Sequence, residues 1–334
     1  MTYRTAVASQ TPEAGRVIRL DADEAGGPWR ATGESPALPG VQAMTRHPSG
    51  RCLYLLDGVG DQVATIGADT LTELGRQPSG GAHPCAIAVH PSGRFAVTAH
   101  YNGAATLAVH PIGADLALAP VAATRDHHGG GGPVTSRQEV AHLHHVNFDP
   151  RRGTAIVTDL GSDRLYEYDF DPSGRPSLVA EASAPAGSGP RHSCFAENGD
   201  LLVSDELSSA LSRYRRDPQT GRLAWVDAAD TRDDADGPAN YPSELVLGPG
   251  VAYVGNRGRD TIAVVDIVGP RLTLAQEVPS GGAFPQHLAV LGDRLLCANR
   301  DSNTITALAI GPDGRLGPPT VVAEVPGPSW ITVL

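Results

Sequence analysis

The sequence contains no lysine, so all 26 of its basic residues are arginines, set against 37 acidic residues and a formal net charge of −11. Affinity for nucleic acid depends on basic side chains that neutralise phosphates, and an acidic chain without a basic run is a poor candidate for it. No run of 18 apolar residues occurs, which argues against a membrane-spanning helix. Residues 1–10 also lack the apolar core of a signal peptide. We therefore expect a cytoplasmic protein with no nucleic-acid partner and no membrane contact.

Cysteine and aromatic residues are scarce, whereas glycine and proline are abundant. The four cysteines, Cys52, Cys85, Cys194 and Cys297, lie far apart and form no C-x-x-C pair. This spacing predicts free, buried thiols and neither a disulfide framework nor a zinc site. The chain has 39 Gly and 28 Pro among 334 residues, and these two residues cost about 1 and 3 kcal/mol in a helix interior. Long helices are therefore not expected.

One pattern recurs along the whole chain: an apolar strand, a polar turn and an alternating strand, as in a β-hairpin. It occupies residues 53–66, 96–109, 155–168, 201–214, 252–265 and 295–308, with a weaker copy at 6–20. The first strand of each copy ends on a polar residue, namely Ser9, Asp57, His100, Asp159, Asp205, Asn256 and Asn299. These residues are 43 to 59 positions apart, and a period near 48 with about four strands predicts one blade of a β-propeller per repeat.

The two ends of the chain complete each other. Residues 329–334 look like an inner strand without its hairpin, and the first repeat lacks an inner strand. We therefore expect a monomeric, all-β, single domain over residues 1–334, with seven four-stranded blades and a ring closed by the C-terminal strand in the first blade. The longest repeat carries an insertion at about 125–141 with a GGGG run. We expect its His127 and His128 to be exposed to solvent.

Equivalent positions in the repeats should form rings of side chains around the axis. One set begins each innermost strand: Gln42, Cys85, His144, Arg191, Ser243, Gln286 and Ser329. The other follows the polar residue of each hairpin: Gln10, Gly58, Tyr101, Leu160, Glu206, Arg257 and Arg300. If both rings lie at one mouth of the channel, three arginines meet a single carboxylate, and the excess positive charge favours an anionic ligand. The alternative is a buried ion network that only stabilises the channel.

A metal site is the weaker interpretation of the histidines. His142 and His144 form an H-x-H pattern that places both on one face of a strand, whereas His145 points away. A catalytic zinc needs a third ligand, for which Glu206 or His192 are candidates. Because H-x-H alone is a weak motif, we expect no metal and no cofactor.

Several motifs together resemble the seven-bladed β-propeller lactonase family, which includes propeller-type 6-phosphogluconolactonases and carboxy-cis,cis-muconate cyclizing enzymes. The motifs are R-Q-x-x-x-H-x-H at 137–144, G-S-G-P-R-H at 187–192, S-D-E-L-S at 204–208, G-N-R-G at 255–258 and G-P-S-W at 327–330. The resemblance implies a His, an Arg, a Glu and a second Arg at the channel mouth. These fall on His144, Arg191, Glu206 and Arg257, which the repeat alignment selects independently. The third repeat departs from the family by carrying His100 before Tyr101.

The leading hypothesis is a metal-independent lactonase acting on a small anionic sugar-type lactone such as 6-phosphogluconolactone. Hydrolysis needs a base for water and a cation for the developing oxyanion. Glu206, assisted or replaced by His144, is the expected base, and Arg191 and Arg257 are expected to hold the anion and the oxyanion. The remaining candidates for substrate binding are Arg300, for a distal phosphate, and His142, Tyr101, Gln286 and His192.

Two other functions remain open, and a third is disfavoured. The same site could run in reverse as a muconate-type lactonizing enzyme, or the propeller could bind a ligand or protein without catalysis. A metal-dependent lactonase of the six-bladed type is disfavoured by the seven repeats and the arginine-rich mouth.

Overall fold

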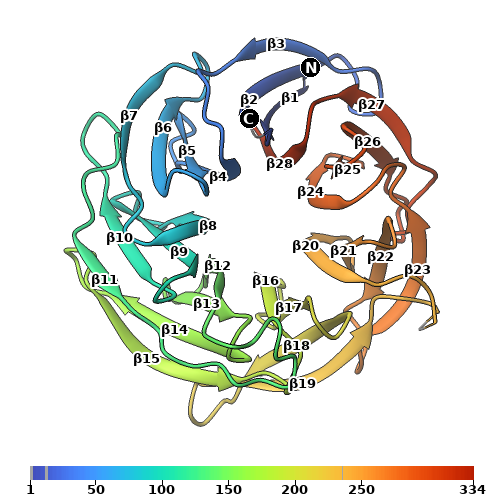
Figure 1. Cartoon of the computed structure of the whole chain (residues 1–334). Helices are drawn as coiled ribbons and strands as arrows, with labels where there is room; N and C mark the ends of the chain where they lie inside the picture. The colour runs from blue at the N-terminus through green and yellow to red at the C-terminus, as the bar shows by residue number, and fades with distance from the viewer. Residues whose placement is uncertain (1–2, 12–13, 235) are drawn as a thin grey trace.

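The chain folds into a ring of seven β-sheets around a central axis (Figure 1). The computed structural model describes residues 3–11, 14–234 and 236–334. Within these ranges there are 28 strands and no helix, so no described segment is a long apolar helix of the kind that crosses a membrane. Each sheet has four antiparallel strands, which confirms the predicted seven-bladed β-propeller. Residues 1–2 of the predicted domain and residues 12–13 of the first hairpin lie outside the described ranges.

The blades follow one another in chain order, and each is described from the axis outwards. Blade 1 contains β28 (Pro328–Val333), β1 (Tyr3–Ser9), β2 (Arg16–Ala22) and β3 (Arg30–Glu34); blade 2 contains β4 (Val41–Arg46), β5 (Cys52–Asp57), β6 (Gln62–Gly67) and β7 (Glu73–Pro78); blade 3 contains β8 (Ala82–Val89), β9 (Phe95–Asn102), β10 (Leu107–Pro111) and β11 (Ala123–Arg125); blade 4 contains β12 (Leu143–Phe148), β13 (Ala155–Asp159), β14 (Arg164–Phe170) and β15 (Pro176–Ser183). Blade 5 contains β16 (Pro190–Phe195), β17 (Leu201–Asp205), β18 (Ala210–Arg216) and β19 (Leu223–Asp230); blade 6 contains β20 (Tyr241–Gly248), β21 (Val251–Arg257), β22 (Thr261–Asp266) and β23 (Thr273–Pro279); blade 7 contains β24 (Pro285–Leu291), β25 (Arg294–Asn299), β26 (Thr304–Ala309) and β27 (Thr320–Glu324).

The ring closes in blade 1, where strands from both ends of the chain pair. β28 runs antiparallel to β1, with Val7 opposite Ile331 and Thr5 opposite Val333. Figure 1 shows both termini in this blade. The pairing confirms the predicted closure and leaves β1 without a free edge on the axis side.

The hydrophobic core is divided into seven clusters, one between each pair of neighbouring blades. Between blades 6 and 7, for example, Tyr253 and Val264 of blade 6 and Leu295 of blade 7 are fully buried in one cluster. Burial of one such side chain contributes about 1.5–3 kcal/mol. Because every blade is packed on both sides, the scaffold holds its inner strands in fixed positions around the axis. All four cysteines are free, as predicted. Cys52 and Cys297 are buried as expected, whereas Cys85 and Cys194 are only partly buried.

Every innermost strand carries a β-bulge at the same position. The register shifts bracket the predicted first ring: Gln42, Cys85, His144, Arg191, Ser243, Gln286 and Ser329. A bulge adds a residue to one strand and changes the direction of its side chain. Strict alternation is therefore broken where the strands reach the channel mouth, so two consecutive residues both serve the interior of the ring.

Hairpin turns fix where the chain starts each following blade. Asp61, Asp163 and Asp260 adopt positive φ angles of 52°, 52° and 60° at these turns. Their carboxylates accept backbone N–H groups of the next blade, at His83 (2.6 Å), Gly189 (2.8 Å) and Phe284 (2.7 Å). Asn and Asp tolerate the left-handed region better than other residues do, so the repeated polar turn serves as a clamp between blades.

Candidate active site

A cavity of about 350 Å³ lies at one mouth of the channel and receives side chains from all seven blades. It is lined by Gln10, Gln42, His83, Cys85, Tyr101, Arg137, His144, Arg191, His192, Glu206, Arg257, Gln286, Arg300 and Trp330. Eight of the nine residues predicted for the site are in this set. The ninth, His142, does not line the cavity.

Glu206, which follows β17, is the centre of a charge cluster. Its Oε2 lies 2.6 Å from Nη2 of Arg257 and 3.1 Å from Nε of Arg191, and its Oε1 accepts a hydrogen bond of 2.7 Å from Arg137. Burial alone would raise the pKa of this carboxyl, but Arg257, Arg191, His144 and Arg137 together hold the pKa well below its usual range. Glu206 is therefore ionised, and both of its oxygens are engaged by guanidinium groups.

Arg137 is a site residue that the sequence interpretation did not assign, although it belongs to one of the quoted motifs. It comes from the insertion between β11 and β12 and also donates to Oη of Tyr101, at 3.2 Å. The neighbouring Gln138 is fully buried and donates to the carbonyl of Leu160, at 2.9 Å. The insertion is thus anchored on blade 4 and delivers a fourth cation to the cavity.

His127, in the same insertion, contradicts the prediction of a solvent-exposed histidine. It is buried, with Nδ1 3.0 Å from the carbonyl of Ala105 and Nε2 2.8 Å from Oη of Tyr168. These two hydrogen bonds satisfy the ring, which explains why a polar side chain is tolerated under the loop. His128 is exposed, as predicted.

Several polar atoms of the cavity wall are buried without a protein partner. Within the described ranges, Nδ1 of His144, Nη1 of Arg191 and Oε1 of Gln286 make no hydrogen bond, and Nε of Arg191 faces Glu206 without hydrogen-bond alignment. An unsatisfied buried group costs about 1–3 kcal/mol. Burial first, and then the neighbouring Arg257, lowers the pKa of Arg191 to about 10. The unpartnered donors of Arg191 favour an anionic ligand, because a purely structural network would leave no such donors open.

Tyr101 separates the two histidines of the H-x-H pattern. The ring of His142 stacks on Tyr101 with centroids 4.3 Å apart, and its Nδ1 lies 2.7 Å from the Tyr101 carbonyl. His144 meets the same tyrosine edge-on at 5.7 Å. His142 therefore supports the cavity wall from behind. The described residues include no group of three or more His, Cys, Asp or Glu side chains arranged to hold a metal ion.

A third ring follows the first predicted ring by one residue in five of the innermost strands, and the sequence interpretation selected only His192 from it. Five consecutive blades contribute polar or aromatic side chains that contact one another in order: His145, His192, Glu244, His287 and Trp330. Of these, only His192 and Trp330 line the cavity. The signal was present in the repeat alignment, since these residues follow the first predicted ring by one position.

Other members of the two predicted rings connect the blades to each other. Cys85 Sγ donates to the carbonyl of Leu143 at 3.1 Å, and Ser243 Oγ donates to the carbonyl of Pro285 at 2.6 Å. Cys85 also lines the cavity, whereas Ser243, Ser329, Gly58 and Leu160 do not. At Gly58 an added Cβ would clash with the side-chain amide of Gln42, so glycine leaves room for Gln42 in the position that it occupies at the mouth. Part of each ring is therefore structural.

Arg300 occupies the outer rim of the cavity. Its guanidinium carbon lies 4.0 Å from the centroid of the Phe284 ring, and that of Arg257 lies 5.4 Å from the same centroid. Nε of Arg300 donates to Asp301 at 2.8 Å. A cation held over an aromatic face keeps a defined position while part of it stays open to solvent, which suits recognition of a distal anionic group.

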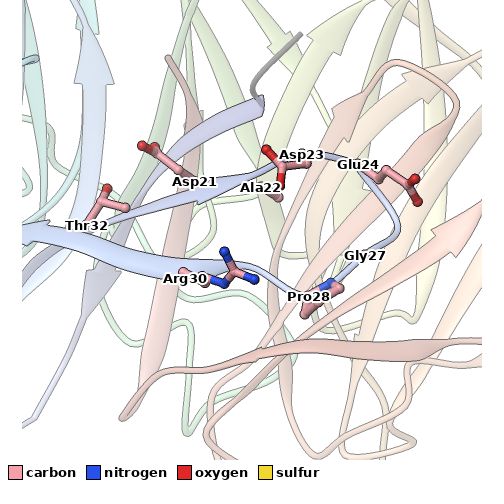
Figure 2. A pocket seen from close by; sticks show the side chains of 8 residues that line it. All are labelled: Asp21, Ala22, Asp23, Glu24, Gly27, Pro28, Arg30 and Thr32. Atoms are coloured by element: carbon pink, nitrogen blue, oxygen red, sulfur yellow. The ribbon is translucent and has the colours of Figure 1, made fainter.

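A second hollow of about 340 Å³ lies on the outside of blade 1 (Figure 2). Figure 2 shows Asp21, Asp23 and Glu24 around it with a single arginine, Arg30. Asp21 is already paired with Arg4 at 3.0 Å. Of the buried, unpartnered polar atoms found in the described residues, none belongs to this hollow. These two hollows are similar in size, and the chemistry of the lining makes the channel mouth the better candidate for a functional site.

A family model described as "Lactonase, 7-bladed beta-propeller" matches residues 4–333. A Bacillus subtilis protein named 6-phosphogluconolactonase is 30% identical over 225 residues, which are 65% of this chain and 62% of that protein. A Pectobacterium carotovorum protein of the same name is 28% identical over 311 residues, 89% of each chain.

Solved structures give the same architecture. A Lactobacillus plantarum protein superimposes with a TM-score of 0.92 at 26% identity, over the full length of both chains. A periplasmic gluconolactonase of Pseudomonas aeruginosa gives 0.89 at 23% identity, over 100% of this chain and 99% of that one. Because the identity to the Pseudomonas aeruginosa protein is only 23%, this similarity shows a shared fold and no more.

Proposed function

The chain belongs to the seven-bladed β-propeller lactonase family, and on that premise we propose that it hydrolyses a small anionic sugar-type lactone, with 6-phosphogluconolactone as the first candidate. The observation that carries the proposal is the charge of the cavity. Four arginines and one carboxylate, Glu206, line it. An anionic substrate would complete the balance of charge, and its oxygens would give the buried donors of Arg191 the acceptors they lack.

The arginines differ in depth and therefore in role. Arg191 and Arg257 are buried, at 4% and 9% exposed. We assign Arg191 to the lactone carbonyl and Arg257, which shares the Phe284 ring with Arg300, to the anionic part of the substrate. Arg300 lies on the rim over Phe284 and suits a phosphate at the far end. A planar guanidinium binds carboxylate and phosphate oxygens in pairs, so the same groups would also hold the acidic product.

The proposed reaction needs only water and the side chains of the cavity. A base takes a proton from water while the water oxygen bonds to the lactone carbonyl carbon. The carbonyl electron pair moves onto its oxygen, where guanidinium and N–H donors stabilise the charge. When the carbonyl reforms, the bond to the ring oxygen breaks, and that oxygen takes the proton back from the base. The product is an open-chain hydroxy acid, and no other reactant is consumed.

The contacts of Glu206 favour a histidine as the base. Its two oxygens are already bound by Arg137, Arg191 and Arg257, which leaves a weakly basic carboxylate. We therefore assign Glu206 to positioning the guanidinium groups. The proton acceptor is then one of the histidines that line the cavity.

The test is a substrate panel with purified protein: 6-phosphoglucono-lactone, the neutral glucono-lactone, and carboxymuconate. We expect kcat/KM to be highest for the phosphorylated lactone, above the rate in buffer alone, and to fall about a hundredfold or more in Arg191→Gln. The control is Arg164→Gln, an arginine exposed on blade 4. No turnover of any lactone, with 6-phosphogluconate still bound in calorimetry, would overturn the proposal in favour of a non-catalytic binding protein. Turnover of carboxymuconate alone would assign a lactonizing enzyme.

A further inference from the structure

Glu244 on β20 joins two histidines behind the cavity wall. Its Oε2 lies 3.1 Å from Nδ1 of His192 and 2.9 Å from Nε2 of His287. Its Oε1 accepts the backbone N–H of Leu245 at 3.0 Å. Burial alone would raise the pKa of Glu244, but His192 and His287 hold it well below the usual range. A buried carboxylate accepts hydrogen bonds only, so both histidines must direct an N–H at it.

This requirement fixes the proton on each imidazole. Nδ1 of His287 faces the backbone N–H of Ile331 at 3.3 Å, so it is the acceptor and Nε2 carries the proton. For His192 the proton is on Nδ1. A neutral imidazole has one N–H, and burial together with Arg191 lowers the pKa of His192 to about 4, which keeps the ring neutral. Nε2 of His192 therefore holds a free lone pair.

That lone pair is not sealed from solvent. His192 is one of the lining residues. Within the described ranges Nε2 of His192 makes no hydrogen bond. It is not among the unpartnered polar atoms that are sealed from solvent, so it remains accessible. The ring is held on its other sides, because His145 stacks on it with centroids 4.5 Å apart. The imidazole thus has one open edge, with an acceptor on it.

His144 has the opposite arrangement. Its Nδ1 is sealed in the wall without a partner, where a bare lone pair is tolerated better than an N–H that finds no acceptor. The proton therefore lies on Nε2, which is absent from the sealed, unpartnered atoms of the described residues. The rings of His144 and His192 stand edge to face with centroids 5.5 Å apart. Two adjacent histidines thus present one donor and one acceptor.

We infer that His192, oriented by Glu244, is the proton acceptor of the proposed lactone hydrolysis, and that His144 donates its Nε2–H to the lactone carbonyl oxygen. The inference rests on the proposed function and specifies its base. Nε2 of His192 takes the proton of water as the water oxygen attacks. Glu244 stabilises the imidazolium through Nδ1–H, as a carboxylate does for a catalytic histidine. The proton returns to the ring oxygen when its bond to carbon breaks, which leaves His192 neutral again.

The experiment compares His192→Asn, Glu244→Gln and His144→Asn with wild type on 6-phosphoglucono-lactone, each after a check of folding by thermal unfolding. We expect kcat to fall about 10² to 10⁴-fold in His192→Asn and about ten- to a hundredfold in Glu244→Gln, while affinity for 6-phosphogluconate changes less than about threefold. The matched controls are His128→Asn, an exposed histidine, and Asp149→Asn, a buried acid paired with Arg216 outside the cavity. The second control is expected to lose stability but keep kcat.

The outcomes separate the two proposals. If wild type is active and His192→Asn keeps at least about a third of its kcat while His144→Asn does not, His192 is not the base, although the lactonase assignment stands. If wild type hydrolyses no lactone, the proposed function itself fails. Nitrogen NMR of the histidine-labelled wild type tests the proton positions without any variant. It should show His192 protonated on Nδ1 and His144 on Nε2, and the reverse pattern would overturn the inference.

Discussion

Arg137 reaches out of the insertion between blades 3 and 4 and places its Nη2 2.7 Å from Oε1 of Glu206 in blade 5. About a third of the Arg137 side chain is exposed, whereas Glu206 is buried. This pair connects the insertion of the longest repeat to a buried carboxylate of the cavity. It also means that the insertion, and not only the ring of blades, determines the charge of the site.

Replacement of Arg137 should weaken substrate binding more than it weakens the fold. Arg137→Gln removes a charged hydrogen bond worth about 1.5–3 kcal/mol, and Glu206 still retains two arginines. We expect KM for the anionic lactone to rise about tenfold, with a loss of about 1 kcal/mol in the free energy of unfolding. Steady-state kinetics and urea unfolding measure both. An unchanged KM, equal to that of the exposed control Arg164→Gln, would show that the insertion does not contribute to binding.

Glu206→Gln should make stability depend on anions. The substitution leaves the guanidinium groups of Arg137, Arg191 and Arg257 without their shared carboxylate, and removing one partner of a buried ion cluster costs about 3–5 kcal/mol. Phosphate or 6-phosphogluconate should restore part of this loss. We expect either anion to raise the melting temperature of the variant more than that of wild type in a thermal-shift series. Equal shifts in both proteins would mean that the cations do not meet in one anion site.

Arg257→Gln should discriminate between charged and neutral substrates. Arg257 is bound to Glu206 at 2.6 Å and faces the cavity, so its loss removes a cation close to the substrate. We expect KM for the phosphorylated lactone to rise about tenfold or more and that for neutral glucono-lactone to change less than about threefold. Equal losses on both substrates would indicate that Arg257 acts on the oxyanion or is structural.

Asp205 should make the protein less stable as the pH rises towards neutrality. Its Oδ2 accepts a hydrogen bond from Ser212, but its Oδ1 is buried with no partner in the described residues. Burial raises the pKa of Asp205 to about 7, and Asp163 adds to the effect. The folded state therefore binds more protons than the unfolded state between about pH 4 and 7. The contribution of protonated Asp205 to the free energy of unfolding is fully present below about pH 4 and is lost as the pH rises through about 7.

Asp205→Asn should remove that dependence. Asn299 occupies the equivalent position in blade 7 and donates to Thr306 at 3.0 Å, as an asparagine at 205 could donate to Ser212. We expect the variant to gain about 1–3 kcal/mol at pH 8 and little at pH 4, measured by urea unfolding. Asp149→Asn, which breaks a buried ion pair with Arg216, should lose stability at pH 8. A loss in both variants would show that Asp205 is already satisfied as a carboxylate.

The fold could be predicted from the sequence because the repeat fixes it. Each hairpin carries its own turn residues, and the closing strand could be recognised because the first repeat lacked one. Cavity residues such as Arg191 and Arg257 were found for the same reason, since equivalent positions in a closed ring meet at one mouth. The repeat symmetry thus indicated which distant residues meet, and a single sequence does not otherwise reveal such long-range contacts.

The parts that were missed depend on departures from that symmetry. The insertion has no counterpart in the other repeats, so neither the reach of Arg137 nor the burial of His127 followed from alignment. Glu244 and His287 were missed because strict strand alternation placed the residue after each ring member on the other face. The bulges in the innermost strands interrupt that alternation, so the residue after each ring member can also face the channel.

Closure by β28 also orders events during synthesis. The strand that completes the first blade follows every other described strand in the chain, and it carries Trp330, which lines the cavity and packs on His287 at 4.0 Å. A nascent chain that still holds these residues in the ribosome tunnel has an open seam in its ring. Until β28 has paired with β1, the cavity therefore lacks part of its wall, so a polypeptide that stops before β28 would lose both the closure of the ring and Trp330.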